Sequence, residues 1–380
     1  PHPPPPPSPA HPHPPALTPH PQDIAVDGLA LTVLSARNKE LGATCNAIGQ
    51  TVGYFLAYTV FLAFSTPEFC NRYLRSASAA SDSALFSLGT FMAFWGWVFV
   101  ASTLWVVLVK RDEHFKQPGS LVQQLGGAYK EMLLVLQLPS VRGMALTLLT
   151  CRLAISAFEA VVPLRLVASG VPKETLALLA SAVMPLGMAS QAYVSYKYFS
   201  GGGVGGGGSK PMSVWMGWYP VRLATGVLSF VLVKIAASYA SAADGLPLWL
   251  YGAMLALTVA STLCSSVMFV ALMAFFNKVS DPAIGGTYMT MLNTLANMGG
   301  AWTGTLALAS VDKLTVSTPC VDGEGCLENE KVLLDGFTVL AGAGMLVGIA
   351  WIAIMRSRVL KLETLPASAW LASHVDLHAA

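Results

Sequence analysis

The chain has 380 residues, of which 54% are hydrophobic and only 11% charged, and its formal net charge is +2. A soluble domain carries about 25% charged residues because its surface is hydrated, so this composition excludes an ordinary soluble domain. The net charge is too small to suggest a nucleic-acid partner, and no basic run is present.

Residues 1–22 form a segment rich in proline and histidine. This composition favours extended polyproline conformation and cannot build a packed core, so we expect a disordered leader. Its four histidines are conceivable metal ligands, but the disordered leader is the preferred interpretation and no metal site is predicted. The segment is not a signal peptide, since it has neither a basic start nor an apolar run. Because no Met begins the chain, we expect it to be a fragment.

Eight long apolar stretches follow the leader. About 20 mainly apolar residues cross a hydrocarbon core roughly 30 Å thick. Such segments must be helical, because an open sheet edge in lipid would leave backbone polar groups unpaired. The predicted fold class is therefore all-α, a polytopic transmembrane helix bundle. The predicted spans are Leu41–Phe64, Leu85–Val109, Gly143–Val167, Thr175–Tyr196, Val221–Ala243, Pro247–Phe276, Ala283–Val311 and Gly336–Met355.

A long polar loop divides these spans into two and six. A transporter built of two six-helix halves gives this pattern when its first four helices are missing, so about eight of twelve helices are expected. The predicted parts are 23–109 as the end of a first bundle, 110–142 as a cytosolic linker with an interfacial helix near Tyr129–Leu138, 143–356 as a second six-helix bundle, and 357–380 as a cytosolic tail. The Gly-rich run 201–208 predicts a flexible linker, because no Gly-Lys-Ser/Thr completes a phosphate loop.

Lys and Arg are in excess in the loops on the side of 110–142, which places that side and both chain ends in the cytosol. Cys320 and Cys326 then lie in a non-cytosolic loop, where a disulfide between them is chemically permitted. Cys45, Cys151 and Cys264 lie in predicted spans and are expected to act as small hydrophobes.

Ionisable residues inside predicted spans are the first candidates for a substrate site, since an unpaired charge in lipid costs several kcal/mol. Arg152, Glu159 and Arg165 share one span, and Arg222 lies near the end of another. One arginine would neutralise Glu159 and leave the other for an anion. The alternatives are that Arg165 only reaches the interface, that Arg152 only braces Glu159, and that Arg222 only follows the positive-inside bias.

Uncharged polar residues form a second group of substrate-binding candidates. Asn46, Gln50 and Tyr54 recur every four residues and share one helix face. Tyr288, Asn293 and Asn297 mark another polar helix, which also contains Gly285-Gly286, Gly299-Gly300 and Trp302. The alternative for all of these is hydrogen bonding between helices without substrate contact.

Three motifs carry a resemblance to a known family. They are Asp23-Ile-Ala-Val-Asp27-Gly28 with Thr44-Cys-Asn46-Ala-Ile-Gly49-Gln50-Thr-Val-Gly53-Tyr54, then Gly170-Val-Pro-Lys-Glu-Thr, and then Lys278-Val-Ser-Asp281-Pro-Ala-Ile-Gly285-Gly286-Thr-Tyr288-Met-Thr-Met-Leu-Asn293 continuing to Trp302. In this order they resemble the acetyl-coenzyme A transporter family, over roughly residues 23–355.

The resemblance implies a major facilitator-like protein of twelve helices in the endoplasmic reticulum membrane. It would import acetyl-CoA from the cytosol into the lumen by alternating access, without cofactor or catalysis. The family does not identify the residues that touch coenzyme A, so the site candidates depend on intramembrane polarity alone. Alternatives are transport of another anion, such as a nucleotide sugar or muropeptide, and an inactive truncated product. A membrane acyltransferase is disfavoured, because all seven His lie outside the predicted spans and such enzymes commonly need a His base.

Overall fold

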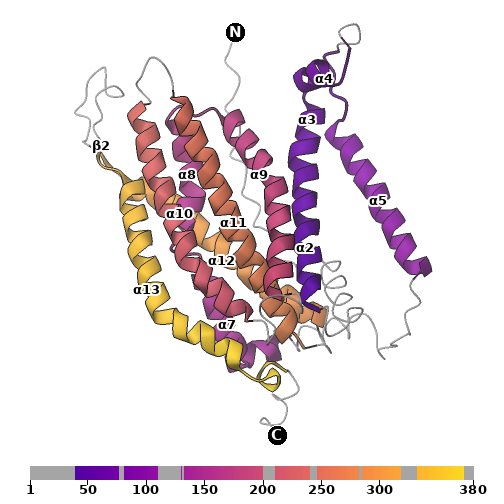
Figure 1. Cartoon of the computed structure of the whole chain (residues 1–380), viewed down its shortest axis with the longest axis vertical. Coiled ribbons are helices and arrows are strands. Elements are labelled where there is room, and N and C mark those ends of the chain that lie inside the picture. The colour runs from indigo at the N-terminus through magenta and orange to yellow at the C-terminus, as the bar shows by residue number, and fades with distance from the viewer. Residues whose placement is uncertain are drawn as a thin grey trace, which may run out of the picture.

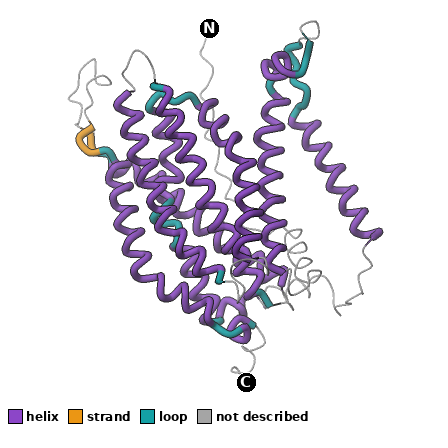
Figure 2. Tube along the Cα trace, viewed as in Figure 1, coloured by secondary structure: helices purple, strands orange, loops and turns teal. Residues whose placement is uncertain are grey.

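The computed structural model describes residues 39–76, 81–109, 130, 132–199, 210–239, 246–281, 285–317 and 332–371. Within these ranges the chain is almost entirely helical (Figure 2). The helices are α2 (Lys39–Tyr54), η1 (Phe55–Val60), α3 (Phe61–Ser65), α4 (Pro67–Tyr73), α5 (Leu88–Val109), α7 (Pro139–Thr150), α8 (Ser156–Ala168), α9 (Lys173–Val194), η3 (Ser195–Phe199), α10 (Pro211–Tyr239), α11 (Leu248–Val279), α12 (Gly285–Leu314), α13 (Gly336–Thr364) and η4 (Ala367–Trp370).

Each of the eight predicted spans coincides with helix, which confirms the all-α polytopic bundle. In the described part of the chain, five helices are long and apolar enough to cross a membrane. They lie at Leu88–Leu108, Leu178–Tyr198, Pro211–Tyr239, Leu248–Val279 and Gly336–Thr364. The other three spans are less regular or more polar. The π-helix η1 interrupts the first, turns separate α7 from α8 in the third, and α12 carries Asn and Thr along its length.

The helices stand side by side and run between two ends of the bundle (Figure 1). We call them the Trp370 end, where α13 finishes, and the Asp335 end, where α13 begins. α10 and α11 form an extensively packed hairpin, and α12 packs against α7, α8 and α13. α2 packs on α9 and α11. α5 approaches α3 near its start, where the ring centroids of Phe91 and Phe61 lie 4.6 Å apart, and most of its other apolar side chains are exposed (Figure 1). A short antiparallel pair, β1 (Val316–Ser317) with β2 (Val332–Leu334), lies at the Asp335 end.

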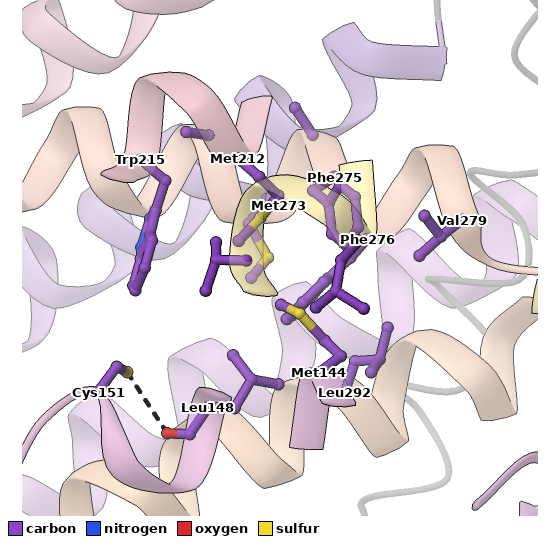
Figure 3. Close-up of a cluster of buried hydrophobic side chains, with 14 of the residues drawn as sticks. Met144, Leu148, Cys151, Met212, Trp215, Met273, Phe275, Phe276, Val279 and Leu292 are labelled. Carbon is purple, nitrogen blue, oxygen red and sulfur yellow. Dashed lines mark hydrogen bonds between the residues drawn. The ribbon is translucent and has the colours of Figure 1, made fainter. Parts of the chain in front are cut away.

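The largest cluster of buried side chains runs from the Trp370 end toward the middle of the bundle and draws large side chains from several helices (Figure 3). Met144 and Leu148 of α7, Met212 of α10 and Phe276 of α11 are at most 1% exposed. Burial of apolar side chains of this size contributes roughly 1.5–3 kcal/mol each in water. In a membrane the comparable gain comes from close packing rather than from leaving water. Close packing of these side chains therefore holds α7, α10 and α11 together.

Polar contacts fasten the last residues of the described chain to the same end. The Glu363 carboxylate accepts hydrogen bonds from the backbone N–H of Met212 (2.9 Å) and of Ser213 (3.2 Å), and so caps the start of α10. The Ser140 hydroxyl donates to the Ala369 carbonyl at 2.6 Å, and Trp370 is 1% exposed. Part of the segment predicted as a tail is thus helix and packed core.

One glycine in α12 permits a very close helix contact. A Cβ built on Gly299 would lie 2.1 Å from the carbonyl oxygen of Leu148 in α7, so only glycine allows these two backbones to approach. On Gly304, further along α12, an added Cβ meets nothing within 4 Å. Gly299 therefore serves the close packing of α12 against α7.

Several predictions fall outside the described residues. They are the leader 1–22, most of the linker 110–142, the glycine run 201–208, and the loop with Cys320 and Cys326. Of the predicted interfacial helix, residues 132–137 are helical, and Val135 is buried in the core at 1% exposure.

Candidate functional site

The site begins with a break between α7 and α8. Residues 151–155 form turns, in which Leu153 donates its backbone N–H to the Thr150 carbonyl and Ile155 donates to the Arg152 carbonyl. In a continuous helix these two N–H groups would instead reach the carbonyls of Leu149 and Cys151. The break therefore leaves the carbonyls of Leu149 and Cys151 without their usual helical donors, close to Arg152 in the chain.

Aromatic side chains from neighbouring helices satisfy the freed groups. Trp302 of α12 donates its indole N–H to the Leu149 carbonyl at 3.0 Å, and Tyr219 of α10 donates its hydroxyl to the Cys151 carbonyl at 2.5 Å. Trp351 of α13 donates to the Thr150 hydroxyl at 2.9 Å and stacks on Tyr219 with ring centroids 4.7 Å apart. Non-helical backbone at membrane depth is tolerated only when protein groups or water satisfy it, and these side chains meet that condition.

The break has no evident cause in its own sequence. Residues 151–155 read Cys-Arg-Leu-Ala-Ile, without Pro or Gly. The three aromatic donors come from helices 68 to 201 residues away along the chain. Tertiary contacts therefore hold the irregular turns, and a reading of local pattern alone predicts a continuous helix.

Three charged side chains meet beside the break. Arg152 Nη1 lies 3.1 Å from Glu159 Oε2, and Arg222 of α10 forms an ion pair with Glu159 through the other carboxylate oxygen, Oε1. Arg222 also donates to Ser261 of α11, both to its hydroxyl and, at 3.4 Å, to its carbonyl. The Arg222 side chain is 11% exposed, against 51% for Arg152 and 34% for Glu159. We call Arg152, Glu159 and Arg222 the cavity cluster.

These residues line a cavity of about 130 Å³. Its wall combines the cavity cluster with amides of α12 and aromatic and apolar side chains. The lining residues are Leu148, Cys151, Arg152, Ile155, Glu159, Trp215, Tyr219, Arg222, Ser265, Met268, Phe269, Leu272, Met273, Asn293, Ala296 and Asn297. Arg152 follows the start of α7 by 13 residues, or roughly 20 Å of helix, which places the cavity near the middle of the bundle.

The structure thus brings five of the predicted site residues to one cavity: Arg152, Glu159, Arg222, Asn293 and Asn297. The sequence indicated that one of Arg152 and Arg165 neutralises Glu159 and leaves the other for an anion. In the structure the second partner of Glu159 is Arg222, whose proximity depends on the packing of α10 against α8. Tyr219 and Trp215 also line the cavity and were not singled out, because aromatic residues in apolar spans are usual.

Arg165 lies in a different cluster at the Asp335 end. It is 2.8 Å from one carboxylate oxygen of Asp335, and Lys234 of α10 is 2.6 Å from the other. Partial burial by itself raises the pKa of Asp335, but hydrogen bonds from Lys234 and Thr338 and the positive charges of Arg165 and Lys234 outweigh it and lower that pKa below its ordinary value of 3.8. We call Arg165, Lys234 and Asp335 the end cluster.

The remaining candidates lie outside the cavity wall. Gln50 donates its side-chain amide to Asn46 at 3.0 Å on the face of α2, and Tyr54 is 60% exposed just before the π-helix η1. Tyr288 is 1% exposed, and its hydroxyl has no hydrogen-bond partner among the described residues. Their substrate contacts remain predictions.

Among the described lining residues, the cavity holds two guanidinium groups against one carboxylate, and so carries an excess of positive charge. Guanidinium groups bind phosphate and carboxylate oxygens with paired hydrogen bonds. A mid-bundle polar cavity beside a broken helix is a common arrangement in membrane transporters. The fold and site therefore define a polytopic helical membrane protein with a polar cavity that carries an excess of positive charge.

Comparisons with known proteins identify the family. The family described as Acetyl-coenzyme A transporter 1 matches residues 17–125 and 207–372, and the chain belongs to it. An uncharacterized membrane protein of Saccharomyces cerevisiae is 25% identical over 92% of this chain and 73% of its own length. An uncharacterized protein of Schizosaccharomyces pombe is 31% identical over 78% of this chain, which spans only 53% of that relative's length. No solved structure matches the chain.

Proposed function

We propose that this protein transports acetyl-CoA from the cytosol into the lumen of the endoplasmic reticulum, as a major facilitator-like carrier. The family match supports the substrate, and the resemblance stated above supplies the membrane and the direction. The single structural observation that carries the proposal is the convergence of Arg152 and Arg222 in a mid-bundle cavity with excess positive charge.

The chemistry of acetyl-CoA fits this cavity. The molecule carries several phosphate oxygens and an adenine ring, and guanidinium groups and aromatic faces suit these two parts respectively. Pockets that enclose a drug-sized ligand measure about 300–1,000 Å³. The cavity of about 130 Å³ therefore accommodates one group of the substrate, and we assign it a phosphate group. The rest of the molecule would lie along the path between the two bundles.

Movement of substrate needs no chemical step in this scheme. The two helical bundles would rock about the central site and expose it alternately to the two sides of the membrane.

Uptake of labelled acetyl-CoA into proteoliposomes that contain the purified protein tests the proposal. We expect uptake that saturates, that unlabelled CoA competes with, and that a nucleotide sugar or a muropeptide does not reduce. Competition by one of those anions instead would assign a different substrate. A well-folded protein that shows no acetyl-CoA uptake would exclude the proposed function.

A further inference from the structure

We infer that Glu159 is a resident anion of the cavity, which occupies the place on Arg152 and Arg222 that a phosphate group takes when the substrate binds. The inference rests on the proposed function and concerns the same cavity. It gives Glu159 a role in release of the substrate, beyond that of an ion-pair partner that braces the helices.

The geometry of the ion pairs is the first reason. Each oxygen of the Glu159 carboxylate contacts a different arginine, Oε2 with Arg152 and Oε1 with Arg222. The carboxylate thus offers two oxygens on one centre to two separate guanidinium groups. A phosphate group offers the same arrangement with further oxygens, so it can replace the carboxylate without rearrangement of the arginines.

The surroundings of Glu159 are the second reason. The described cavity wall contains no other carboxylate. The turns after α7 contribute Cys151, α10 contributes Tyr219, and α12 contributes Asn293 and Asn297. α11 contributes the Ser265 hydroxyl to the wall and the Ser261 hydroxyl to Arg222, and α13 approaches α8 through glycine, at Gly344. Glu159 is therefore the negative group in this wall that competes with an incoming anion.

Exposure and anchoring show which members of the cluster can exchange partners. Arg222 is nearly buried and is held by Ser261 as well as by Glu159, so it keeps its position when the carboxylate leaves. Glu159 and Arg152 are 34% and 51% exposed. Water reaches side chains with this exposure and screens their charges when they separate. A phosphate can therefore displace the Glu159 side chain, which stays hydrated after it leaves the arginines.

A resident anion would serve transport in two ways. It lowers the affinity for substrate, because binding must break two ion pairs, and it compensates the arginines again when the substrate leaves. Efficient passage through a membrane site requires binding strong enough for entry and weak enough for exit. Without the carboxylate, the two uncompensated guanidinium groups would retain a phosphate ligand.

The test compares ligand affinity with transport rate in the purified full protein. Dissociation constants of acetyl-CoA and of inorganic pyrophosphate would be measured by calorimetry for the wild type, Glu159→Gln, Glu159→Asp and Asp335→Asn. Loss of a competing charge-assisted contact predicts about tenfold tighter binding of both ligands to Glu159→Gln. Net uptake of acetyl-CoA by this variant should be slower, with a lower KM. S-acetylpantetheine, which has no phosphate, should bind all four proteins equally.

The other two variants separate charge from structure. Glu159→Asp keeps the negative charge and should bind both ligands with nearly wild-type affinity. Asp335→Asn removes a carboxylate that also bridges two cations, but at the end of the bundle, and should leave the affinities unchanged. If Glu159→Gln does not fold, retention of wild-type affinity by Glu159→Asp but about tenfold tighter binding by Glu159→Ala supports the inference. Equal or weaker binding by every folded neutral variant overturns it.

The outcomes also distinguish this inference from the proposed function. If the wild type transports acetyl-CoA and neutral variants bind it no more tightly, the resident-anion role is wrong and the proposed function stands. If the wild type transports no acetyl-CoA but neutral variants bind pyrophosphate more tightly, the proposed substrate is wrong and the role of Glu159 stands.

Discussion

The cavity cluster and the end cluster contain the same charges in different surroundings. In each, one carboxylate lies between two cationic side chains, Glu159 between two arginines and Asp335 between Arg165 and Lys234. Asp335 also caps α13, since it accepts hydrogen bonds from the Phe337 backbone N–H at 3.3 Å and from the Thr338 hydroxyl at 2.8 Å. The carboxylate of Asp335 is therefore fully engaged in joining α8, α10 and α13.

Glu159 has no such capping role. It lies in the first turn of α8, beside the turns that separate α7 from α8, and its partners face a cavity. An ion pair that also caps a helix is part of the fold, whereas an ion pair that lines a cavity at membrane depth is available to a ligand. The two clusters have the same charges, but Asp335 caps a helix and Glu159 lines a cavity, and this difference separates their roles.

The largest expected effect is a loss of acetyl-CoA uptake when an arginine of the cavity cluster is removed, compared with removal of a lysine from the end cluster. Arg222→Ala removes the nearly buried guanidinium of the cavity cluster, and uptake of acetyl-CoA should fall by about a hundredfold, because a charged hydrogen-bond partner of the phosphate and the anchor of Glu159 are both lost. Lys234→Ala, the matched change in the end cluster, should leave uptake within about twofold, since the contact it removes is a partly exposed ion pair.

Initial rates of uptake into proteoliposomes, normalised to the amount of folded protein, measure both variants. Equal losses in Arg222→Ala and Lys234→Ala would mean that the cavity cluster has no special role in substrate binding. Arg222→Lys serves as an intermediate, because it keeps the charge without the planar guanidinium fork.

The next largest effect is expected at the close contact between Gly299 of α12 and Leu148 of α7. Gly299→Ala places a methyl group against the Leu148 carbonyl, a backbone atom that no rotamer change can move, so α7 and α12 must separate. We expect a loss of about 2 kcal/mol of stability, typical of overpacking, together with reduced uptake. Gly304→Ala on the same helix meets open space and is the control. Unfolding of the detergent-solubilised protein on heating reports the difference, and similar melting temperatures would contradict the close contact.

Much of this fold follows from the sequence, because a membrane span is a long apolar run and the chain has eight of them. The candidate charges were also visible, since an ionisable residue in such a run is conspicuous. Their pairing was not. Arg165 belongs with Asp335, 170 residues away, and Arg222 with Glu159, 63 residues away, and these contacts depend on which helices are neighbours. The break at residues 151–155 was also missed, because distant aromatic donors hold it.

A smaller effect is expected at the end cluster itself. Asp335→Asn weakens two ion pairs and should lower the free energy of unfolding by about 1 kcal/mol, discounted for the exposure of Arg165 and Lys234. The folded-state pKa of Asp335 is lowered, so its contribution is complete above its unfolded-state pKa and disappears as the pH falls through the lower folded-state value. The difference in melting temperature between wild type and Asp335→Asn should therefore be constant from pH 7 to pH 5 and shrink below about pH 4. A difference that persists unchanged at pH 2 would show that this carboxylate does not stabilise the fold through its charge.

The smallest effect tests how the break beside the cavity cluster is held. Trp302→Phe keeps an aromatic ring in α12 but removes the indole N–H that the Leu149 carbonyl accepts, so this carbonyl loses its partner. This hydrogen bond is exposed and water can replace the donor, so its loss costs about 0.5 kcal/mol. The KM for acetyl-CoA should rise slightly, because Arg152 moves with the loosened turns. Trp97→Phe on α5, where the side chain is 74% exposed, is the matched control. If both variants melt and transport alike, the turns at residues 151–155 do not need this donor, and Tyr219 and Trp351 suffice to hold Arg152 at the cavity. The end cluster lies at the other end of α8 from the break. The pH dependence of the melting temperature, which reports on Asp335, should therefore be the same in Trp302→Phe and Trp97→Phe.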